Sequence, residues 1–299
     1  MALALAIVLF AAAVLWDQLR VLTMAQIRMA WDGTTLQALG WSLLGVAVSF
    51  ACLASYEVVA TRRAAPGCVP AGTALLVGML AHALSNALGL HVLTGSAVRY
   101  RAYRPLGLGV AEVARVLALV ALYVGTGVAA ISLVALLSLH LNPATGSWRT
   151  QWVGVSLLLP IACAWAWRRH IFGASWATGR AAWLGQRIGG MVLLGMVEMG
   201  AAIGALYVLL PDAPGPAAFV LVFVCAMLLG IASHAPGGIG VFEAAILAAL
   251  PAGDDARALV ALLLYRLLYN LMPLTLAIIA LLVKRWLQGA STPSVRWRI

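Results

Sequence analysis

Charged residues are scarce in this chain of 299 residues. Aspartate, glutamate, lysine and arginine together make up 9% of it, whereas 64% of the residues are hydrophobic and the mean hydropathy is +1.02. A soluble protein of this length cannot bury that much apolar surface, but a membrane protein can expose it to lipid. The scarcity of charge therefore excludes an ordinary soluble domain and predicts a membrane protein.

Cysteine is also scarce, and its spacing matches no cysteine motif. The four cysteines are isolated, and three of them lie inside apolar runs (Cys52, Cys68, Cys163 and Cys225). Because no Cys-x-x-Cys pair and no Cys/His cluster occurs, neither a disulfide framework nor a zinc site is supported. We expect a protein without a bound metal or other cofactor.

Catalytic motifs are absent from the sequence. Its five histidines are scattered along the chain (His82, His91, His140, His170 and His234). No HExxH, GxSxG or P-loop pattern occurs, so the sequence offers no metalloprotease, nucleophile-elbow or nucleotide-phosphate site. We therefore expect that the protein is not an enzyme.

Acidic residues are outnumbered by basic ones, 9 against 19, and the formal net charge is +10. In a soluble domain such a surplus would suggest nucleic acid, but here the basic residues are dispersed between apolar runs and form no tract. Basic loops of this kind orient a membrane protein and contact anionic headgroups. We expect the membrane as partner and no nucleic-acid binding.

Long apolar runs make up most of the chain. Six of them are predicted to cross the bilayer as helices (residues 1–16, 38–60, 108–139, 152–167, 188–210 and 259–283). The first lacks a basic segment and a small-residue cleavage site, so we interpret it as a short helix rather than a signal peptide. The sequence thus predicts an all-α polytopic membrane protein with about six full transmembrane helices.

Two further apolar runs, 71–93 and 217–250, are interrupted by residues that favour turns. The interruptions contain Ser85, Asn86 and Gly89 in the first run, and Ser233, His234, Pro236, Gly237, Gly238 and Gly240 in the second. We interpret each run as a re-entrant hairpin, which enters and leaves the membrane on the same side. The alternative is two kinked ordinary helices, each bent for its own reason.

The distribution of basic residues favours the two hairpins. With them in place, thirteen of the 19 basic residues share one face (Arg62, Arg63, Arg99, Arg101, Arg104, Arg168, Arg169, Arg180, Arg187, Lys284, Arg285, Arg296 and Arg298). The other face keeps Arg20, Arg28, Arg149 and Arg257. By the positive-inside rule the basic face is cytoplasmic, which places both termini in the cytoplasm.

The two breaks also resemble each other. Residues 85–89, SNALG, and 233–237, SHAPG, share Ser, Ala and Gly, and they lie 148 positions apart, about half the chain. One hairpin would enter from the cytoplasm and the other from outside, as in inverted-repeat transporters. We therefore divide the chain into a first helix with an interfacial segment (1–37), a first repeat with its break near 85–96 (38–150), and a second repeat with its break near 233–243 (151–299).

Several ionisable residues fall inside or beside the predicted spans. An ionisable residue in a span is costly and is by default a functional candidate. The candidates here are Glu57, Arg99, Arg101, Glu198, Glu243 and Arg266.

Most of these candidates also have a structural interpretation. Glu57 could pair with Arg62 or Arg63. Arg99 and Arg101 could be ordinary loop residues, and Glu243 could be a helix-start residue. Arg266 could extend to the interface, or it could pair with Glu243 or a ligand phosphate. Glu198 lies mid-span without an evident partner.

Four motifs resemble those of the lysylphosphatidylglycerol synthase/flippase transmembrane family. Residues 94–103, TGSAVRYRAY, are similar to its G-S-x-x-R-Y-R-x-Y signature, and residues 233–243, SHAPGGIGVFE, to its S-H-x-P-G-G-x-G-x-F-E signature. Tyr265 and Arg266, followed by Tyr269 and Pro273, match a closing Y-R-x-x-Y-x-x-x-P pattern, and residues 55–57, SYE, an S-Y-acid segment. The resemblance covers about residues 40–285.

The resemblance implies paired re-entrant elements and the translocation of phospholipids with charged, possibly aminoacylated, headgroups between leaflets. The residues that would carry it are Glu57, Arg99, Arg101, Glu243 and Arg266. Two departures are that the position of Glu57 is more often Asp in the family, and that the chain has no room for an aminoacyl-transferase domain. It therefore resembles the stand-alone relatives without that domain.

The sequence therefore predicts an integral protein of the bacterial cytoplasmic (inner) membrane that moves phospholipids, with a homodimer left open. Two alternatives remain, namely an inverted-repeat secondary transporter of a small solute and a membrane assembly partner that transports nothing.

Overall fold

The computed structural model describes residues 33–88, 91–141, 181–210, 213–233, 236–250 and 255–290, and these residues form helices and short connections without a strand. The predicted all-α polytopic membrane fold is confirmed. Five helical stretches are long and apolar enough to cross a membrane (Leu36–Ala64, Ala71–Leu88, Val110–Leu141, Gly189–Tyr207 and Arg257–Ala280). The predicted crossings at 1–16 and 152–167 lie outside the described residues.

Helix α3 (Leu36–Ala64) begins and ends at residues suited to its termini. The hydroxyl of Thr35 caps the start by accepting a hydrogen bond from the Ala38 amide at 3.1 Å. Arg62 and Arg63 lie in the last turn, where a positive charge is favourable against the helix dipole. The guanidinium of Arg63 also donates a hydrogen bond to the Tyr123 hydroxyl at 2.7 Å, which ties α3 to α6 (Val110–Leu141).

Two helical hairpins lie at the two interrupted runs, but Ser85 and Asn86, expected in the first interruption, are helical residues in the last turns of α4, because Ser and Asn are tolerated in a helix and do not by themselves end it. In the first, α4 (Ala71–Leu88) packs against α5 (His91–Tyr103), and in the second, α9 (Pro216–Ala232) packs against α10 (Val241–Leu247). Helix α5 has 13 residues and α10 has 7, hence lengths of about 20 and 10 Å. Both are too short to cross a hydrocarbon core of about 30 Å. The re-entrant path of these hairpins through a membrane stays a prediction.

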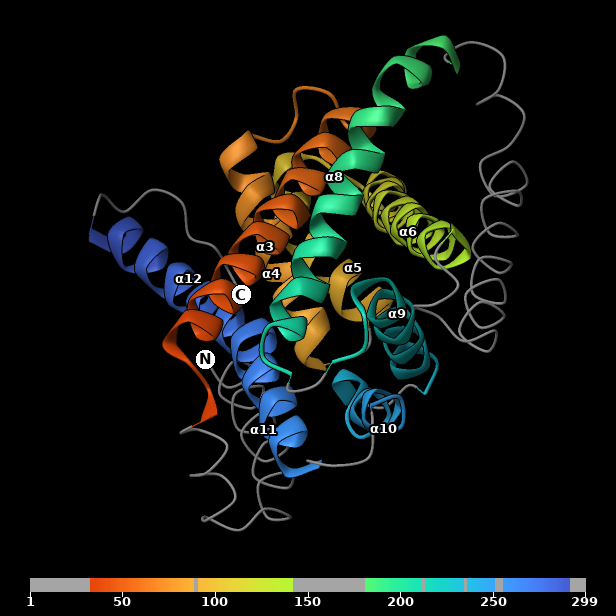
Figure 1. Ribbon diagram of the computed structural model, residues 1–299. Helices are drawn as coiled ribbons and strands as arrows, with labels where there is room; N and C mark the ends of the chain where they lie inside the picture. Colours follow the sequence, from red (N-terminus) through yellow and green to blue (C-terminus); the bar gives the residue numbers. More distant parts are fainter. Residues whose placement is uncertain are drawn as a thin grey trace.

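Helix α8 (Ala181–Tyr207) lies along α3 and also contacts α6 (Figure 1). At the contact of α6 and α8 the glycines Gly127 and Gly195 face each other so closely that a Cβ on either would come within 2.6 Å of the other backbone. The small residues let the two backbones touch, which is the usual way in which membrane helices gain contact.

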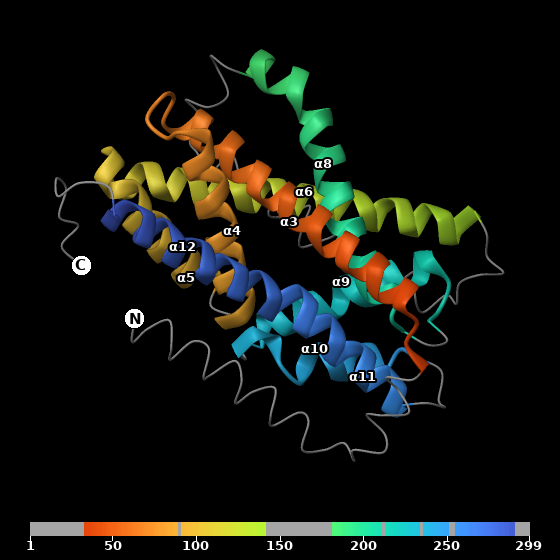
Figure 2. The same ribbon diagram turned by 90° about the vertical axis from the view of Figure 1, so that its left-hand side faces the viewer.

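The last described stretch is one long helix (Figure 2). Its middle contains a wider, π-helical turn. It consists of α11 (Asp255–Arg266), the π-helical turn η5 (Leu267–Leu271) and α12 (Met272–Ala290). Pro273 explains the turn, because it has no N–H to donate and its ring disfavours a regular α-helix over the preceding residues. The wide turn begins directly after Arg266.

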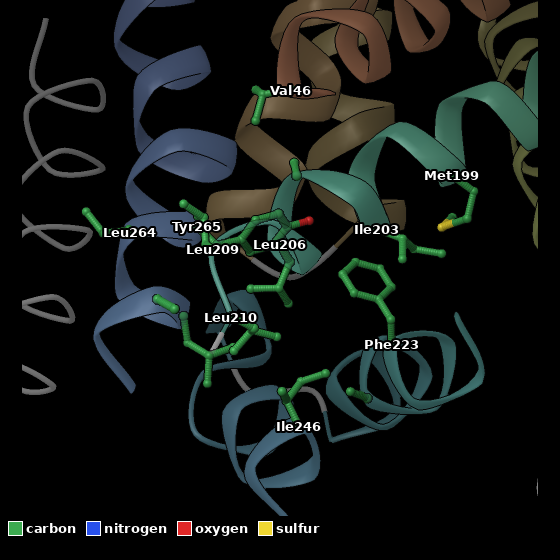
Figure 3. Packing of buried hydrophobic residues seen from close by; sticks show 14 of the residues in the cluster. Val46, Met199, Ile203, Leu206, Leu209, Leu210, Phe223, Ile246, Leu264 and Tyr265 are labelled. Atoms are coloured by element: carbon green, nitrogen blue, oxygen red, sulfur yellow. The ribbon is translucent and has the colours of Figure 1, made fainter. Parts of the chain in front are cut away.

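Buried apolar side chains from most of the helices form one large cluster. Figure 3 shows members from α3 (Val46), α8 (Ile203), α9 (Phe223), α10 (Ile246) and α11 (Tyr265). Large apolar residues are also exposed on the outside, as lipid contact requires (Trp41, Leu44, Leu75, Leu133, Leu137, Leu193, Leu276 and Ile279 among them). The division of the chain at residues 37 and 150 stays a prediction.

Candidate functional site: a cavity between two helical hairpins

The break of the second hairpin contacts the break of the first. Pro236–Gly238 form a short turn, η4, in which Gly237 and Gly238 have φ values of 62° and 64°. A Cβ on Gly237 would lie 3.3 and 3.4 Å from the carbonyl oxygens of Ala87 and Asn86. Glycine is therefore required here both by the left-handed backbone and by the close approach of the two breaks.

A buried ion pair joins the second arm of the first hairpin to α3. Arg99 of α5 donates from Nε and Nη2 to the carboxylate of Glu57, with a shortest distance of 2.7 Å, and the Tyr103 hydroxyl donates to the same carboxylate at 2.8 Å. The side chains of Arg99 and Glu57 are 3% and 0% exposed. The alternative prediction, that Glu57 pairs with Arg62 or Arg63, was wrong. The fork of Arg99 matches the carboxylate in a way that lysine could not.

A second buried ion pair joins the second arm of the other hairpin to α11. Arg266 donates from Nε to Glu243, and from Nη1 to the backbone carbonyl of Gly237 at 3.0 Å. The other carboxylate oxygen of Glu243 accepts a hydrogen bond from the Gly240 amide at 2.8 Å, at the start of α10. Glu243 is thus both a helix-start residue and the partner of Arg266, and the pairing expected for these two residues is present.

A third buried carboxylate forms no ion pair with an arginine in the described part of the chain. Glu198 of α8 is 3% exposed, and its Oε1 accepts a hydrogen bond from Ser49 at 3.1 Å. The Ser49 hydroxyl is also 2.8 Å from the hydroxyl of Tyr269. The second carboxylate oxygen, Oε2, has no hydrogen-bond partner among the described residues. Glu198 therefore differs from Glu57 and Glu243, which are both held by a guanidinium.

These polar groups surround one cavity of about 480 Å³ between the hairpins, α6, α8 and α11. Its wall contains both breaks and both arginines, together with Glu198, whereas most of the other lining residues are apolar. The polar residues of the wall are His82, Ser85, Asn86, Arg99, Glu198, Tyr265, Arg266, Tyr269 and Asn270. The cavity is therefore an apolar space with a few convergent polar groups, which is the usual form of a binding site for a small molecule or headgroup.

The predicted site residues do not all reach this cavity. Arg101 is exposed on α5 and does not belong to its wall, so of the two candidate arginines on this helix Arg99 is the one at the cavity. Among the break residues, Ser85, Asn86, Gly237 and Gly238 line it. Ser233 ends α9 by donating to the Gly230 carbonyl at 2.7 Å. Gly89 and His234 lie outside the described residues.

Sequence reasoning gave no role to three residues of the site, although two of them, Tyr103 and Tyr269, stand in the quoted motifs. Tyr103 follows Arg99 by four positions and so lies on the same face of α5, a spacing that could have indicated it. Ser49 and Tyr269 are far apart in sequence and meet at Glu198 only through the packing of α3 against the π-helical turn. In the part of the chain that the structure describes, no three His, Cys, Asp or Glu side chains gather as a metal site would require.

Comparisons with known proteins give two relatives. An uncharacterized protein of Synechocystis is 29% identical over 260 residues, which cover 78% of this chain and 75% of that protein. The phosphatidylglycerol lysyltransferase of Staphylococcus aureus is 27% identical over 248 residues, which cover 79% of this chain but only 28% of the lysyltransferase. No protein-family model matches the chain. The chain is thus weakly related to one part of a much longer bacterial protein.

Proposed function

We propose that this multi-pass membrane protein is a lipid translocator that moves phospholipids with charged headgroups between the two leaflets. The observation that carries the proposal is the cavity in which two helix breaks and two arginines, Arg99 and Arg266, meet. Irregular backbone at membrane depth is tolerated only where protein or a wet cavity covers it. A cavity of this kind offers polar partners to a headgroup inside an otherwise apolar protein.

The chemistry of the wall favours an anionic phosphate. Arg99 and Arg266 cannot lose their charge, and their planar guanidinium groups match phosphate oxygens. Each is neutralised by a carboxylate that does not itself line the cavity, Glu57 and Glu243 respectively. A phosphate that enters can share the guanidinium with that carboxylate, so the site can bind a headgroup without leaving a bare buried charge when it is empty.

The edge of the cavity favours a lipid over a soluble solute. Two of its lining residues, Val92 of α5 and Ile231 of α9, are 68% and 47% exposed. An apolar rim at the outside of the bundle suits acyl chains that stay in the bilayer while the headgroup crosses. The charged groups are paired as Arg99 with Glu57 and Arg266 with Glu243, an arrangement that can bind and release a charged headgroup. We therefore propose transport rather than catalysis.

One of the two relatives supports a function that concerns lipids. The name of the Staphylococcus aureus relative refers to phosphatidylglycerol and to lysyl transfer, and this chain matches 28% of that protein. Because its relatives are bacterial, the proposal places the chain in the cytoplasmic membrane. The distribution of basic residues places both termini in the cytoplasm.

Reconstitution tests the proposal. The full chain is placed in phosphatidylglycerol liposomes that contain acyl-labelled fluorescent lysylphosphatidylglycerol or phosphatidylglycerol, and the fraction open to an external quencher is followed with time. We expect faster exchange for at least one of these lipids, and a loss of about tenfold for Arg99→Gln, the size typical of one charge-assisted contact. Glu112→Gln, at the exposed start of α6, is the matched control and should exchange lipid like the parent chain. Exchange no faster than in protein-free liposomes for both lipids would refute the proposal.

A further inference from the structure

Glu198 is a buried carboxylate to which the proposed function, with phosphate bound by Arg99 and Arg266, assigns no role. It lines the same cavity as the two arginines, and in the described structure its Oε2 lacks a hydrogen-bond partner. A bare carboxylate in such surroundings is strongly disfavoured, so it must either hold a proton or face a cation. The carboxyl group of Glu198 is thus held at Oε1 by Ser49, while Oε2 is available to a ligand in the cavity.

Among the residues that the structure describes, the groups nearest to Glu198 are hydroxyls and a thiol, and no cation is paired with it. Cys52 and Tyr56 of α3 and Tyr265 and Tyr269 of α11 and η5 are within electrostatic range of it. His82 of α4 and the paired Arg99 and Arg266 line the same cavity, to which α6 and α9 contribute no ionisable side chain among the lining residues. The cation that balances Glu198 therefore has to come from the cavity.

The geometry around Glu198 fits a proton or a primary ammonium better than a metal ion. A hard metal ion such as calcium or magnesium requires about six oxygen ligands around one point. Glu198 offers one free oxygen, and its nearest hydroxyl, that of Ser49, is already engaged with Oε1 and with Tyr269. A proton needs one oxygen only, and an ammonium can donate one of its three N–H groups to Oε2 and the others to water.

We infer that Glu198 is an exchangeable cation site, which holds a proton while the cavity is empty and the ammonium of a headgroup while it is occupied. On binding, the O–H bond of the carboxylic acid breaks, the proton passes to water in the cavity, and the carboxylate pairs with the incoming ammonium. On release of the lipid, one proton is taken up again. The inference rests on the proposed function and deepens it, because it selects lipids that carry both a phosphate for the arginines and an amine for Glu198.

This exchange would couple lipid movement to protons. One proton leaves for each ammonium that enters, so the net charge of Glu198 and its bound cation stays constant through the cycle. A lipid without an amine leaves Glu198 protonated and the exchange unused. The direction of net movement then follows the proton gradient, which gives the transporter an energy source that requires no nucleotide.

Infrared spectroscopy of the full chain in nanodiscs of phosphatidylglycerol and cardiolipin, which contain no amine, tests the site directly. We expect the C=O band of a buried carboxylic acid that disappears when lysylphosphatidylglycerol is added, persists when more phosphatidylglycerol is added, and is absent from Glu198→Gln. The Gln variant keeps an acceptor for Ser49 and nearly the same volume, and Glu112→Gln should retain the band. Absence of the band in the parent chain, or its persistence in the presence of lysylphosphatidylglycerol, would overturn the inference.

Lipid exchange in the liposomes described above separates this inference from the proposed function. We expect Glu198→Gln to slow exchange of lysylphosphatidylglycerol about tenfold and to leave that of phosphatidylglycerol within about twofold, because one charge-assisted contact is lost. Equal exchange of lysylphosphatidylglycerol by the parent chain and the variant would overturn the inference while transport stands. Release of the proton on lipid binding without exchange of any lipid would refute transport and support the cation site.

Discussion

At the scale of single residues, the two arginines of the cavity are held in different ways. Arg99 binds the carboxylate of Glu57 with two nitrogens and shares it with Tyr103. Arg266 divides its donors between Glu243 and the Gly237 carbonyl, so it also fixes the turn. Both pairs are buried, and removal of one partner from such a pair costs far more than the pair itself contributes.

The pair of Glu243 and Arg266 gives a prediction on stability. Glu243→Gln leaves the guanidinium of Arg266 buried without its counter-charge, which should lower the free energy of unfolding by about 3–5 kcal/mol. Arg266→Leu should similarly destabilise by stranding Glu243. The double variant should recover most of the folded yield, measured by size-exclusion chromatography after heating, but no lipid exchange. Additive losses in this cycle would mean that the two residues do not interact.

The pair of Glu57 and Arg99 gives a prediction on geometry. Arg99→Lys keeps the charge but loses the two-pronged contact, so we expect a loss of about 1.5–3 kcal/mol in thermal unfolding and weaker lipid exchange. Tyr103→Phe, which removes one hydrogen bond to the same carboxylate, should cost about 1 kcal/mol. If Lys at position 99 behaved like Arg, the charge alone would matter and the planar fork would not.

At the scale of elements, the two hairpins carry opposite charges on corresponding arms. The second arm of the first hairpin, α5, offers Arg99 to a carboxylate on the long helix α3. The second arm of the other hairpin, α10, offers Glu243 to an arginine on α11, the first part of the long last helix. The breaks contact each other through Gly237, and both line the cavity. In each hairpin the second arm is thus tied by one ion pair to a helix outside the hairpin.

The turn of the second hairpin can be tested by adding side chains. In the double variant Gly237→Leu, Gly238→Leu, each leucine must adopt a positive backbone φ, which costs about 1–2 kcal/mol per residue. A Cβ at position 238 would also lie 3.1 Å from the Gly230 Cα. We expect insertion into the membrane but a loss of lipid exchange, since the turn that places Glu243 is displaced. Exchange and insertion are measured on the same reconstituted sample.

Gly204→Leu provides the control for this double variant. Gly204 lies within α8, and a Cβ there meets nothing within 4 Å, so the bulky side chain has open space. It should leave lipid exchange unchanged. Full exchange in the Gly237 and Gly238 double variant would show that the turn is not required and that the segment acts as a kinked helix.

At the scale of the whole molecule, the predicted topology has a natural reporter. Cys68 is exposed in the connection between α3 and α4, which the charge distribution assigns to the cytoplasm. In a variant whose other cysteines are replaced by alanine, Cys68 should react with a membrane-impermeant maleimide in inverted vesicles and not in intact cells. A cysteine introduced at Ala213, in the connection before α9, should show the opposite pattern. Labelling of both positions from one side would rule out the predicted topology.

The sequence by itself determined the class of the protein and most of its chemistry. Composition alone predicted the membrane fold, because 64% hydrophobic residues cannot be buried in a soluble chain of this length. The breaks were visible because glycine and proline act locally, through backbone conformation, wherever the chain later folds. Arg266 and Glu243 could be matched because they are close in sequence and both are costly in an apolar setting.

Only the tertiary structure decided which charges meet. Glu57 lies nearer in sequence to Arg62 and Arg63. The packing of α5 nevertheless places Arg99, 42 positions away, against the Glu57 carboxylate on α3. Arg101, two residues on, points away, because positions two apart on a helix do not share a face. Ser49, which donates to Glu198, lies 149 positions from it, and Tyr269, which bonds to the same Ser49 hydroxyl, lies 220 positions from Ser49. Such contacts depend on how whole helices pack, and local sequence patterns do not encode that.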